Sequence, residues 1–232
     1  TNYFEYGQRL AGLKALVTSG PTYEPLDPVR FIGNRSSGKQ GHAIAEALRD
    51  MGAQVTLVSG PVALPNTVGI KTIHVETAVE MLAACQTALP ADIAVCAAAV
   101  SDWSAMTISR QKIKKSTNKT PPDIKLKENP DILAALSRRA GKRPALVVGF
   151  AAETEMLIEA AREKMAHKGC DWIVANDVGA GEKIFGADNS HVFLLTTAGQ
   201  EEWQGEKMQI ARRLAERIAA HFESKSEQQA AE

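Results

Sequence analysis

Residues 14–59, KALVTSGPTYEPLDPVRFIGNRSSGKQGHAIAEALRDMGAQVTLVS, decide the expected fold. The runs Lys14–Ser19 and Val55–Ser59 are short, contain β-branched residues and are each closed by a Gly-Pro pair, which is typical of strands. Between them, an apolar pattern at helical spacing begins near Ile44. The stretch therefore predicts a βαβ unit with a long loop after its first strand. Open α/β sheets bind ligands at that edge.

The rest of the chain continues this alternation. We expect further strands at Thr72–Val75, Asp92–Val100, Ala145–Phe150, Trp172–Ala175 and Val192–Thr196, and helices at Ala78–Thr87, from about Asp131, at Glu153–His167 and across Ile210, Leu214, Ile218 and Phe222. The run Asp92–Val100 is almost continuously apolar, which is typical of a central strand covered on both faces. The predicted fold class is α/β, a doubly wound, mostly parallel Rossmann-like sheet with helices on both faces.

Length and composition favour one domain that binds neither nucleic acid nor a membrane. The chain has 232 residues, of which 44% are hydrophobic, enough for one substantial core. Its 27 basic and 27 acidic residues cancel, and no apolar run reaches transmembrane length. We expect a linker or arm at residues 1–12, a single domain at 13–223 and a polar, frayed tail at 224–232.

The three cysteines, Cys85, Cys96 and Cys170, indicate a reducing compartment. Their number is odd and they lack CxxC or Cys/His spacing, which argues against a disulfide framework or a structural zinc site. We therefore expect a cytoplasmic protein in which Cys96 packs in the core.

The loop before the first helix carries a predicted anion pocket. Ser36, Ser37 and Gly38, with Lys39 behind them, lie at a helix N-terminus, where unpaired N–H groups and the positive end of the macrodipole favour a phosphate or carboxylate. A plain helix start, capped by one of the serines and closely packed through its glycines, is the alternative. Residues 33–39 also fit the P-loop pattern G-x-x-x-x-G-K, but a glutamine follows where Ser or Thr would hold magnesium.

Residues Ser104–Asn129 interrupt the α/β pattern with a basic segment. Its basic residues are Arg110, Lys112, Lys114, Lys115, Lys119, Lys125 and Lys127. Lys112–Lys115 and Ile124–Leu126 are expected to form the two arms of a ribbon around a Pro-Pro turn. Such a run is either a solvated face or a flap whose lysines neutralise a polyphosphate across a dimer interface. RNA binding is less expected, since no aromatic residues interleave with the lysines.

Four further groups of residues follow predicted strand ends or begin helices. Asp102 is a candidate for magnesium or a ribose hydroxyl, or is a helix cap or turn residue. The Asn-Pro-Asp sequence that ends at Asp131 starts a helix, with N–H groups for phosphate or with an ordinary cap. Phe150 either walls a base pocket or belongs to the core. Lys164 and Lys168 lie on one helix face, either facing one anion or solvated.

These motifs, in this order, resemble the phosphopantothenoylcysteine synthetase (phosphopantothenate–cysteine ligase) family. The matching blocks are GPTYEPLDPVRFIGNRSSGKQG, AAAVSDW, KIKK, KENPDI, VVGFAAET and ANDV, and the match runs from about Leu13 to Phe222. Gly33 stands where the family usually has Ser, and Gln40 where it usually has Met. The second departure explains the near-match to a P-loop as coincidence.

The resemblance implies a ligase that works in two half-reactions. In the bacterial type, often fused behind a flavin-dependent decarboxylase, the carboxylate of 4′-phosphopantothenate attacks the α-phosphate of CTP. This gives an acyl-cytidylate and pyrophosphate, and the amine of L-cysteine then displaces CMP. Mg²⁺ is the implied cofactor, CTP the co-substrate and a homodimer the implied assembly.

The resemblance also implies roles for particular residues. Asn34 resembles the asparagine that holds the acyl-cytidylate, and Lys112 the flap lysine that serves its conversion; these are the expected catalytic residues. The expected nucleotide-binding residues are Ser36, Ser37, Gly38, Lys39, Cys96, Ala97, Ala98, Asp102, Lys112, Pro130, Asp131, Ile132, Leu133, Phe150, Lys164 and Lys168. Arg30, Asn34 and Ala99 are expected to bind substrate, and Asp102 a metal ion.

Two other function classes share parts of this pattern. An NAD(P)-dependent reductase would use the same sheet, but no strand is followed directly by G-x-G-x-x-G with an acid about twenty residues later. A non-catalytic nucleotide-binding module would need the anion pocket but would not need Asn34 and Lys112 together. An assay for CTP-dependent pyrophosphate release separates such a module from the ligase.

Overall fold

The computed structural model describes residues 7–114, 121–153, 156–177 and 189–231, and an eight-stranded sheet forms its centre. The strand order is β12-β11-β10-β9-β6-β1-β4-β5. These strands are β1 (Lys14–Ser19), β4 (Gln54–Ser59), β5 (Lys71–His74), β6 (Ile93–Cys96), β9 (Leu146–Glu153), β10 (Trp172–Asp177), β11 (Asn189–Leu195) and β12 (Gln200–Glu206). From β5 to β10 all neighbours are parallel, whereas β11 and β12 are added antiparallel.

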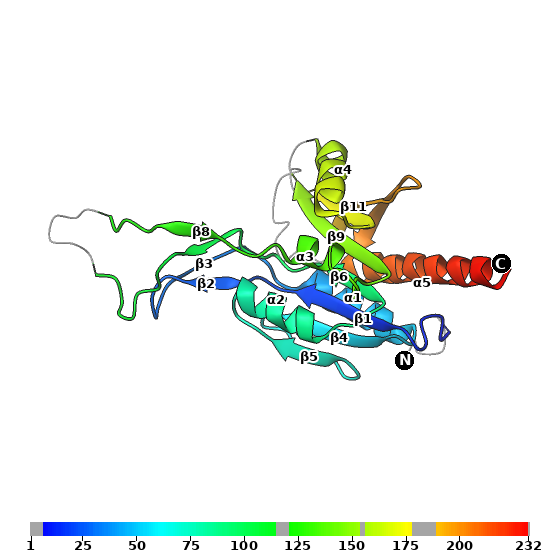
Figure 1. The fold of residues 1–232 in the computed structure, drawn as a ribbon, viewed down its shortest axis with the longest axis horizontal. Coiled ribbons are helices and arrows are strands. Elements are labelled where there is room, and N and C mark those ends of the chain that lie inside the picture. Colours follow the sequence, from blue (N-terminus) through cyan, green and yellow to red (C-terminus); the bar gives the residue numbers. More distant parts are fainter. Residues whose placement is uncertain (1–6, 115–120, 154–155, 178–188, 232) are drawn as a thin grey trace.

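Helices cover both faces of the sheet (Figure 1). They are α1 (Lys39–Asp50), α2 (Ala78–Thr87), α3 (Ile132–Ser137), α4 (Leu157–Lys168) and α5 (Lys207–Ala231). α1 and α5 pack together over one face, where Ile44 and Leu214 belong to one core. α2, α3 and α4 supply the core of the other face, with Met81 and Leu136 fully buried. The predicted fold class is therefore confirmed.

Most predicted elements are observed within a few residues, and the differences have local causes. β12 was not predicted because its sequence QEEWQGE buries only Trp203, so it lacks an apolar face that alternation could reveal. The predicted helix from Glu153 begins at Leu157, because β9 continues further than its apolar run. The expected strand Asp92–Val100 pairs as a regular strand only to Cys96.

The polar C-terminal segment is helical instead of frayed. α5 continues to Ala231, because the residues after Phe222 include no Gly or Pro and several strong helix formers. Glu223 also accepts two hydrogen bonds of 2.7 Å from Arg9, which tie the N-terminal segment to this helix beside the fully buried Leu10. Within the part of the chain that the structure describes, none of the helices has the length and hydrophobicity that crossing a membrane requires.

A narrow arm projects from the sheet (Figure 1). It consists of two antiparallel ribbons, β2 (Tyr23–Pro25) with β3 (Phe31–Gly33) and β7 (Trp103–Ala105) with β8 (Leu126–Glu128), which contact each other through β2 and β7. The first ribbon follows β1 and the second follows β6, so both leave from the neighbouring strands at the centre of the sheet. These two strands flank the point at which the strand order reverses, where ligands bind in doubly wound sheets.

The predicted ribbon exists, but its strands are not those that the sequence predicted. Trp103–Ala105 pairs with Leu126–Glu128, whereas Lys112 and its described neighbours form no strand with Ile124–Leu126. The backbone of residues 109–113 instead bonds to the turn before β3; for example, the Ser109 N–H donates to the Leu26 carbonyl at 3.0 Å. The rest of the predicted first arm and the loop after it, residues 115–120, lie outside the described residues.

Candidate active site

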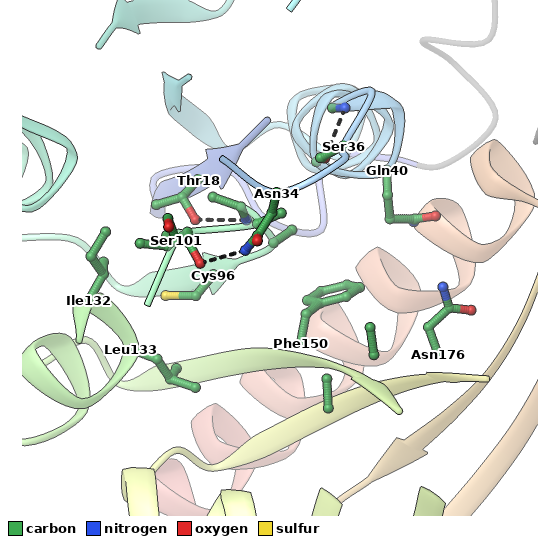
Figure 2. Close-up of a pocket in the computed structure, with 18 of the residues that line it drawn as sticks. Thr18, Asn34, Ser36, Gln40, Cys96, Ser101, Ile132, Leu133, Phe150 and Asn176 are labelled. Atoms are coloured by element: carbon green, nitrogen blue, oxygen red, sulfur yellow. Dashed lines mark hydrogen bonds between the residues drawn. The ribbon is translucent and has the colours of Figure 1, made fainter. Parts of the chain in front are cut away.

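A cleft of about 690 Å³ opens at the carboxyl ends of β1, β6 and β9 (Figure 2). It is lined by Thr18, residues 34–41, 96–103, 128–133 and 150–152, Lys164, Lys168, Asn176, Ser190, Val192 and Lys207. This lining includes every expected nucleotide-binding residue except Lys112, and it includes Asn34 and Ala99. The structure therefore brings together most of the residues that the sequence singled out in separate motifs.

The predicted anion loop forms one wall of the cleft and leads into α1. Gly38 is the N-cap residue of α1, with a left-handed φ of 73°, and no side chain caps the helix. The Ser36 hydroxyl accepts from the Gly38 N–H at 3.3 Å, and the Ser37 hydroxyl accepts from the N–H of Lys39, the first residue of α1, at 3.5 Å. Neither serine is the N-cap residue, so that part of the alternative is not observed, whereas its close packing through glycine is.

Close packing holds this loop against the end of β1. The Ser19 hydroxyl donates to the Gly38 carbonyl at 2.9 Å, and His42 Nδ1 lies 3.0 Å from the same hydroxyl and 3.1 Å from the same carbonyl. Burial lowers the pKa of His42 and favours its neutral ring, and Nδ1 is the protonated nitrogen where it faces the Gly38 carbonyl, which can only accept. A Cβ atom on Gly41 would lie only 2.6 Å from the Ser19 Cβ atom. Glycine is therefore required for α1 to start this close to β1.

The backbone after β6 forms the floor of the cleft, and Asn34 is fastened to it. The N–H groups of Ala97 and Ala98 donate to the Thr18 carbonyl and hydroxyl, each at 3.2 Å. The Asn34 carboxamide donates from Nδ2 to the Val100 carbonyl at 2.9 Å (Figure 2). One of its two N–H bonds is used in this contact, so the contact fixes the direction of the other.

A carboxylate and two lysines lie on the opposite wall. Asp131 caps α3 by accepting from the Ala134 N–H at 2.9 Å, and it pairs with Lys168 at 2.5 Å. Burial by itself would raise the pKa of Asp131, but the Ala134 N–H and the ammonium group of Lys168 lower it. Lys164 lies one helical turn from Lys168 and lines the same cleft, so both lysines can approach a single bound anion.

Three side chains define the remaining surroundings of the cleft. The Phe150 ring projects into it from β9 and is only half-buried, so it is a wall of the cleft as well as a neighbour of the core (Figure 2). Cys96 packs against the core and also lines the cleft, as both expectations for it required, because β6 ends there. Asp102 is exposed at the cleft, and among the described residues no group of three or more His, Cys, Asp or Glu side chains forms a metal site.

Arg30 and Lys112 are the expected site residues that the cleft does not include. Both lie on the projecting arm, and Lys112 is exposed. Arg30 pairs with Asp27 at 2.7 Å and lies outside the cleft. These two cations therefore do not line the cleft that Asn34 lines.

Sequence reasoning missed the far end of the cleft, formed by Asn176, Ser190, Val192 and Lys207. Asn176 belongs to the ANDV block, which carried the resemblance but was given no role. The other three lie at the starts of β11 and α5, or close to them, and become neighbours of the cleft only through the antiparallel edge of the sheet. No motif in the sequence marks them.

The family described as "DNA/pantothenate metabolism flavoprotein C-terminal domain" matches residues 10–222 of the chain. The chain belongs to this family. A relative in the family is the Escherichia coli (strain K12) "Coenzyme A biosynthesis bifunctional protein CoaBC", which is 42% identical over 220 residues. The match covers 94% of this chain and 54% of that protein, so this chain spans about half the length of the curated relative.

Solved structures support the assignment to the DNA/pantothenate metabolism flavoprotein C-terminal domain family. The "Crystal structure of the C-terminal Domain of Coenzyme A biosynthesis bifunctional protein CoaBC" matches with a TM-score of 0.78 at 34% identity, covering 94% of this chain and 99% of that one. A structure titled "Cab2 mutant H337A complex with phosphopantothenate-cysteine" has a TM-score of 0.73 at 17% identity, covering 95% and 90% respectively, and shares the fold. The resemblance inferred from the motifs is therefore confirmed.

Proposed function

We propose that this domain is a CTP-dependent ligase that joins 4′-phosphopantothenate and L-cysteine into 4′-phosphopantothenoyl-L-cysteine. The observation that carries this proposal is the convergence of Asn34, the anion loop and the pair Lys164 and Lys168 on one cleft. The relative in Escherichia coli is named for coenzyme A biosynthesis, and the Cab2 structure is titled as a complex with phosphopantothenate-cysteine. Both names support this choice of substrates.

In the first half-reaction, the phosphopantothenate carboxylate attacks the α-phosphorus of CTP and pyrophosphate leaves. The protein contributes by positioning and electrostatics, because the attacking carboxylate and the triphosphate are both negative. The first turn of α1 starts at the cleft and offers backbone N–H groups, beyond those bonded to Ser36 and Ser37, to phosphate oxygens, and Lys164 and Lys168 bring positive charge from the opposite wall. Asp131 holds the Lys168 ammonium group in place before the nucleotide arrives.

In the second half-reaction, the amine of free cysteine attacks the acyl carbonyl and CMP leaves. Negative charge grows on the carbonyl oxygen, and the second N–H of the Asn34 carboxamide is the proposed donor to it. The nucleophile belongs to the substrate, so the chain needs no reactive thiol. In agreement, burial raises the pKa of the Cys96 thiol well above its ordinary value. The three cysteines are free, which also supports the proposed cytoplasmic location.

The choice of CTP rests on backbone recognition of a small base. The N–H groups of Ala97 and Ala98 are already bonded to Thr18, so recognition at these residues must use their carbonyl oxygens. A carbonyl oxygen accepts from the exocyclic amine of cytosine. Phe150 provides an aromatic wall on which the base can stack.

Mg²⁺ is proposed as the ion that accompanies the nucleotide. Asp102 offers a hard carboxylate ligand at the cleft, and Mg²⁺ is commonly held by one or two carboxylates together with substrate phosphates. The donor set therefore fits an ion that arrives with CTP. When bound, Mg²⁺ neutralises charge on the triphosphate.

A homodimer would complete the site with Arg30 and Lys112 from the partner copy. Among the exposed large hydrophobic residues in the described part of the chain, seven of ten lie on the arm: Val29, Phe31, Trp103, Met106, Ile108, Ile124 and Leu126. An apolar surface of this kind on a projecting ribbon needs a packing partner. Because the two cations lie on the same arm and outside their own cleft, the partner copy is the proposed source of both charges at each site.

The decisive experiment measures pyrophosphate release and ligated product with phosphopantothenate, cysteine and either CTP or ATP. We expect CTP-dependent pyrophosphate release that requires phosphopantothenate but not cysteine, and product only when cysteine is added. Pyrophosphate release with ATP but not with CTP would contradict the choice of nucleotide. No release with either nucleotide would contradict the ligase and favour a binding module.

Mixing two variants that are impaired in product formation tests the shared site, with ligated product as the measured activity. Asn34→Asp damages the cleft and Lys112→Gln damages the arm, so a mixed dimer of the two has one intact site. After subunit exchange at equal concentrations, we expect about a quarter of wild-type activity, since half of the dimers are mixed and each has one working site. Either variant alone, treated in the same way, is the control. A mixture no more active than its components would place Lys112 in its own protomer's site or outside the mechanism.

A further inference from the structure

Asp27 is a buried carboxylate on the arm, outside the cleft. It is 3% exposed, and it lies in the turn before β3, within the sequence Asp-Pro-Val-Arg. Its Oδ1 atom accepts from the N–H groups of Val29 and Arg30 at 2.8 and 2.9 Å, which closes the turn around Pro28. Its Oδ2 atom accepts from Arg30 Nε and Nη2 at 3.0 and 2.7 Å.

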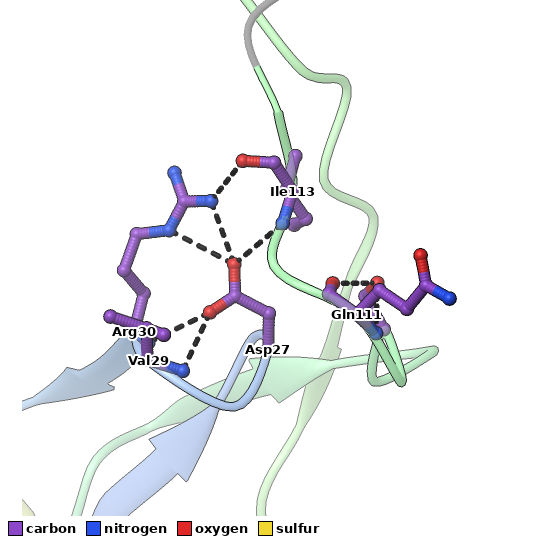
Figure 3. A network of polar contacts seen from close by, with 6 residues as sticks. Asp27, Val29, Arg30, Gln111 and Ile113 are labelled. Atoms are coloured by element: carbon purple, nitrogen blue, oxygen red, sulfur yellow. Dashed lines mark hydrogen bonds and ion pairs between the residues drawn. The ribbon is translucent and has the colours of Figure 1, made fainter.

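The same carboxylate reaches a second segment, far away in the sequence (Figure 3). Oδ2 of Asp27 accepts from the Ile113 N–H at 3.0 Å, and Arg30 Nη2 donates to the Ile113 carbonyl at 2.5 Å. Both backbone groups of Ile113 are therefore held by the pair of Asp27 and Arg30. With the bond from Ser109 to Leu26, the segment from Ser109 to Ile113, which contains Arg110 and Lys112, is fastened at both of its ends.

A carboxylate is the side chain that can accept all five of these hydrogen bonds. An ionised carboxylate has two acceptor oxygens and no donor, and here Oδ1 accepts two of the bonds while three donors share Oδ2. The carboxamide of asparagine would direct an NH₂ group at N–H donors of Arg30 or the backbone. Burial alone would raise the pKa of Asp27, but the bonds from Ile113, Val29 and Arg30 hold it well below its ordinary value. Asp27 is therefore ionised at neutral pH.

We propose that Asp27 is a positioning residue for the ligase reaction. It fixes the segment from Ser109 to Ile113, at the start of the flap, so that Lys112 and Arg30 are held in one defined geometry. Lys112 is the residue immediately before Ile113, so its backbone cannot move independently of this tie. Arg30 has its guanidinium oriented by Asp27 while its side chain is 44% exposed and accessible to a ligand. The inference rests on the proposed function, because these cations serve substrates only if the domain is the ligase.

The test combines Asp27→Asn with Lys112→Gln and Arg30→Gln in the full chain. Asp27→Asn should lower kcat for product about 10-fold or more and leave the KM for CTP within about 2-fold, because misplacing a group by about 1 Å is costly while the cleft stays intact. Because Asp27 is proposed to act through both Lys112 and Arg30, adding Asp27→Asn to a Lys112→Gln, Arg30→Gln variant should slow product formation by no more than about 2-fold. The proposal would be overturned if the reduction in kcat caused by Asp27→Asn were just as large in the Lys112→Gln, Arg30→Gln variant as in wild type. An Asp27→Asn variant as active as wild type would also overturn it.

Hydrogen–deuterium exchange supplies a readout that does not depend on activity. In Asp27→Asn, the backbone amides of residues 109–114 should exchange about 10-fold faster than in wild type, and unchanged exchange would overturn the proposal. If wild type makes neither pyrophosphate nor product, the proposed function fails, and this comparison still decides whether Asp27 holds the flap. Ile113→Pro removes the N–H on the flap side and leaves the turn intact. It should reproduce the loss of product if Asp27→Asn does not fold.

Asp171→Asn is the matched control. Asp171 also accepts from an arginine, Arg143 at 2.9 Å, and from a backbone N–H, that of Val147 at 2.7 Å, but it lies outside the cleft and the arm. Its substitution should lower thermal stability and leave kcat and the exchange of residues 109–114 unchanged. An equal fall in kcat for both variants would show that Asp27 contributes only stability.

Discussion

Gly41→Ala tests whether the approach of α1 to β1 builds the anion loop. A Cβ atom at position 41 would lie 2.5 Å from the Ser19 hydroxyl oxygen, 2.6 Å from its Cβ and 3.0 Å from its Cα. The last contact is with backbone, so a change of rotamer cannot relieve it. Ordinary contacts begin at 3.4 Å, and the start of α1 must therefore retreat from β1 by about 1 Å.

The stability cost of this retreat is small compared with its expected effect on activity. Overpacking costs about 1–3 kcal/mol, and Ala recovers about 1 kcal/mol over Gly within a helix. For a domain of this size, the net cost of up to about 2 kcal/mol lowers Tm by up to about 8 °C. The same displacement carries Gly38 away from Ser19, and a shift of about 1 Å in a substrate-positioning group can reduce kcat/KM about 100-fold.

The assay compares kcat/KM for CTP, from pyrophosphate release, with Tm for the same preparations. Gly141→Ala is the control, because Gly141 also has a left-handed φ that disfavours alanine, but it lies outside the cleft with open space around it. We expect similar losses of Tm and a loss of activity only in Gly41→Ala. If both variants keep wild-type kcat/KM, or lose it equally, the packing of α1 on β1 does not position the nucleotide.

Three further predictions concern single groups. Asn34→Asp should still release pyrophosphate but form product slowly, since a carboxylate cannot donate to the developing oxyanion; equal loss of both half-reactions would show a purely positional role. Burial raises the pKa of Cys170 from 9.0 to about 11, so iodoacetamide at pH 8 should alkylate it about 100-fold more slowly than a free thiol, and rapid labelling by mass spectrometry would contradict this. Because folding lowers the pKa of Asp27 from 3.8, its carboxylate stabilises the fold fully above about pH 4 and less as pH falls; the difference in Tm between wild type and Asp27→Asn should therefore narrow below about pH 4, and a constant difference would refute the assignment.

The sequence by itself determined the alternation of strands and helices and most of the residues around the cleft. Periodicity reports which face of an element is buried, and turn residues report where an element ends, so β1, α1 and α2 were predictable from local pattern. In a doubly wound sheet, the carboxyl ends of the parallel strands meet at one edge. The order of the elements was therefore enough to expect Asn34 and Phe150 in a common site.

Only the tertiary structure decided the features that depend on pairing between distant segments, namely the antiparallel edge of the sheet and the conformation of the flap. β12 joins the sheet through antiparallel hydrogen bonds that its weak apolar pattern does not reveal, and that edge brings Lys207 and its neighbours to the far end of the cleft. The pairing of β7 with β8 and the hydrogen bonds of Ile113 to Asp27 and Arg30 determine the conformation of the flap. The basic composition of the segment specifies neither of them. Contacts between distant segments have no fixed spacing in the sequence. The carboxylate of Asp27 can therefore be predicted to accept hydrogen bonds, but the segment that donates them cannot.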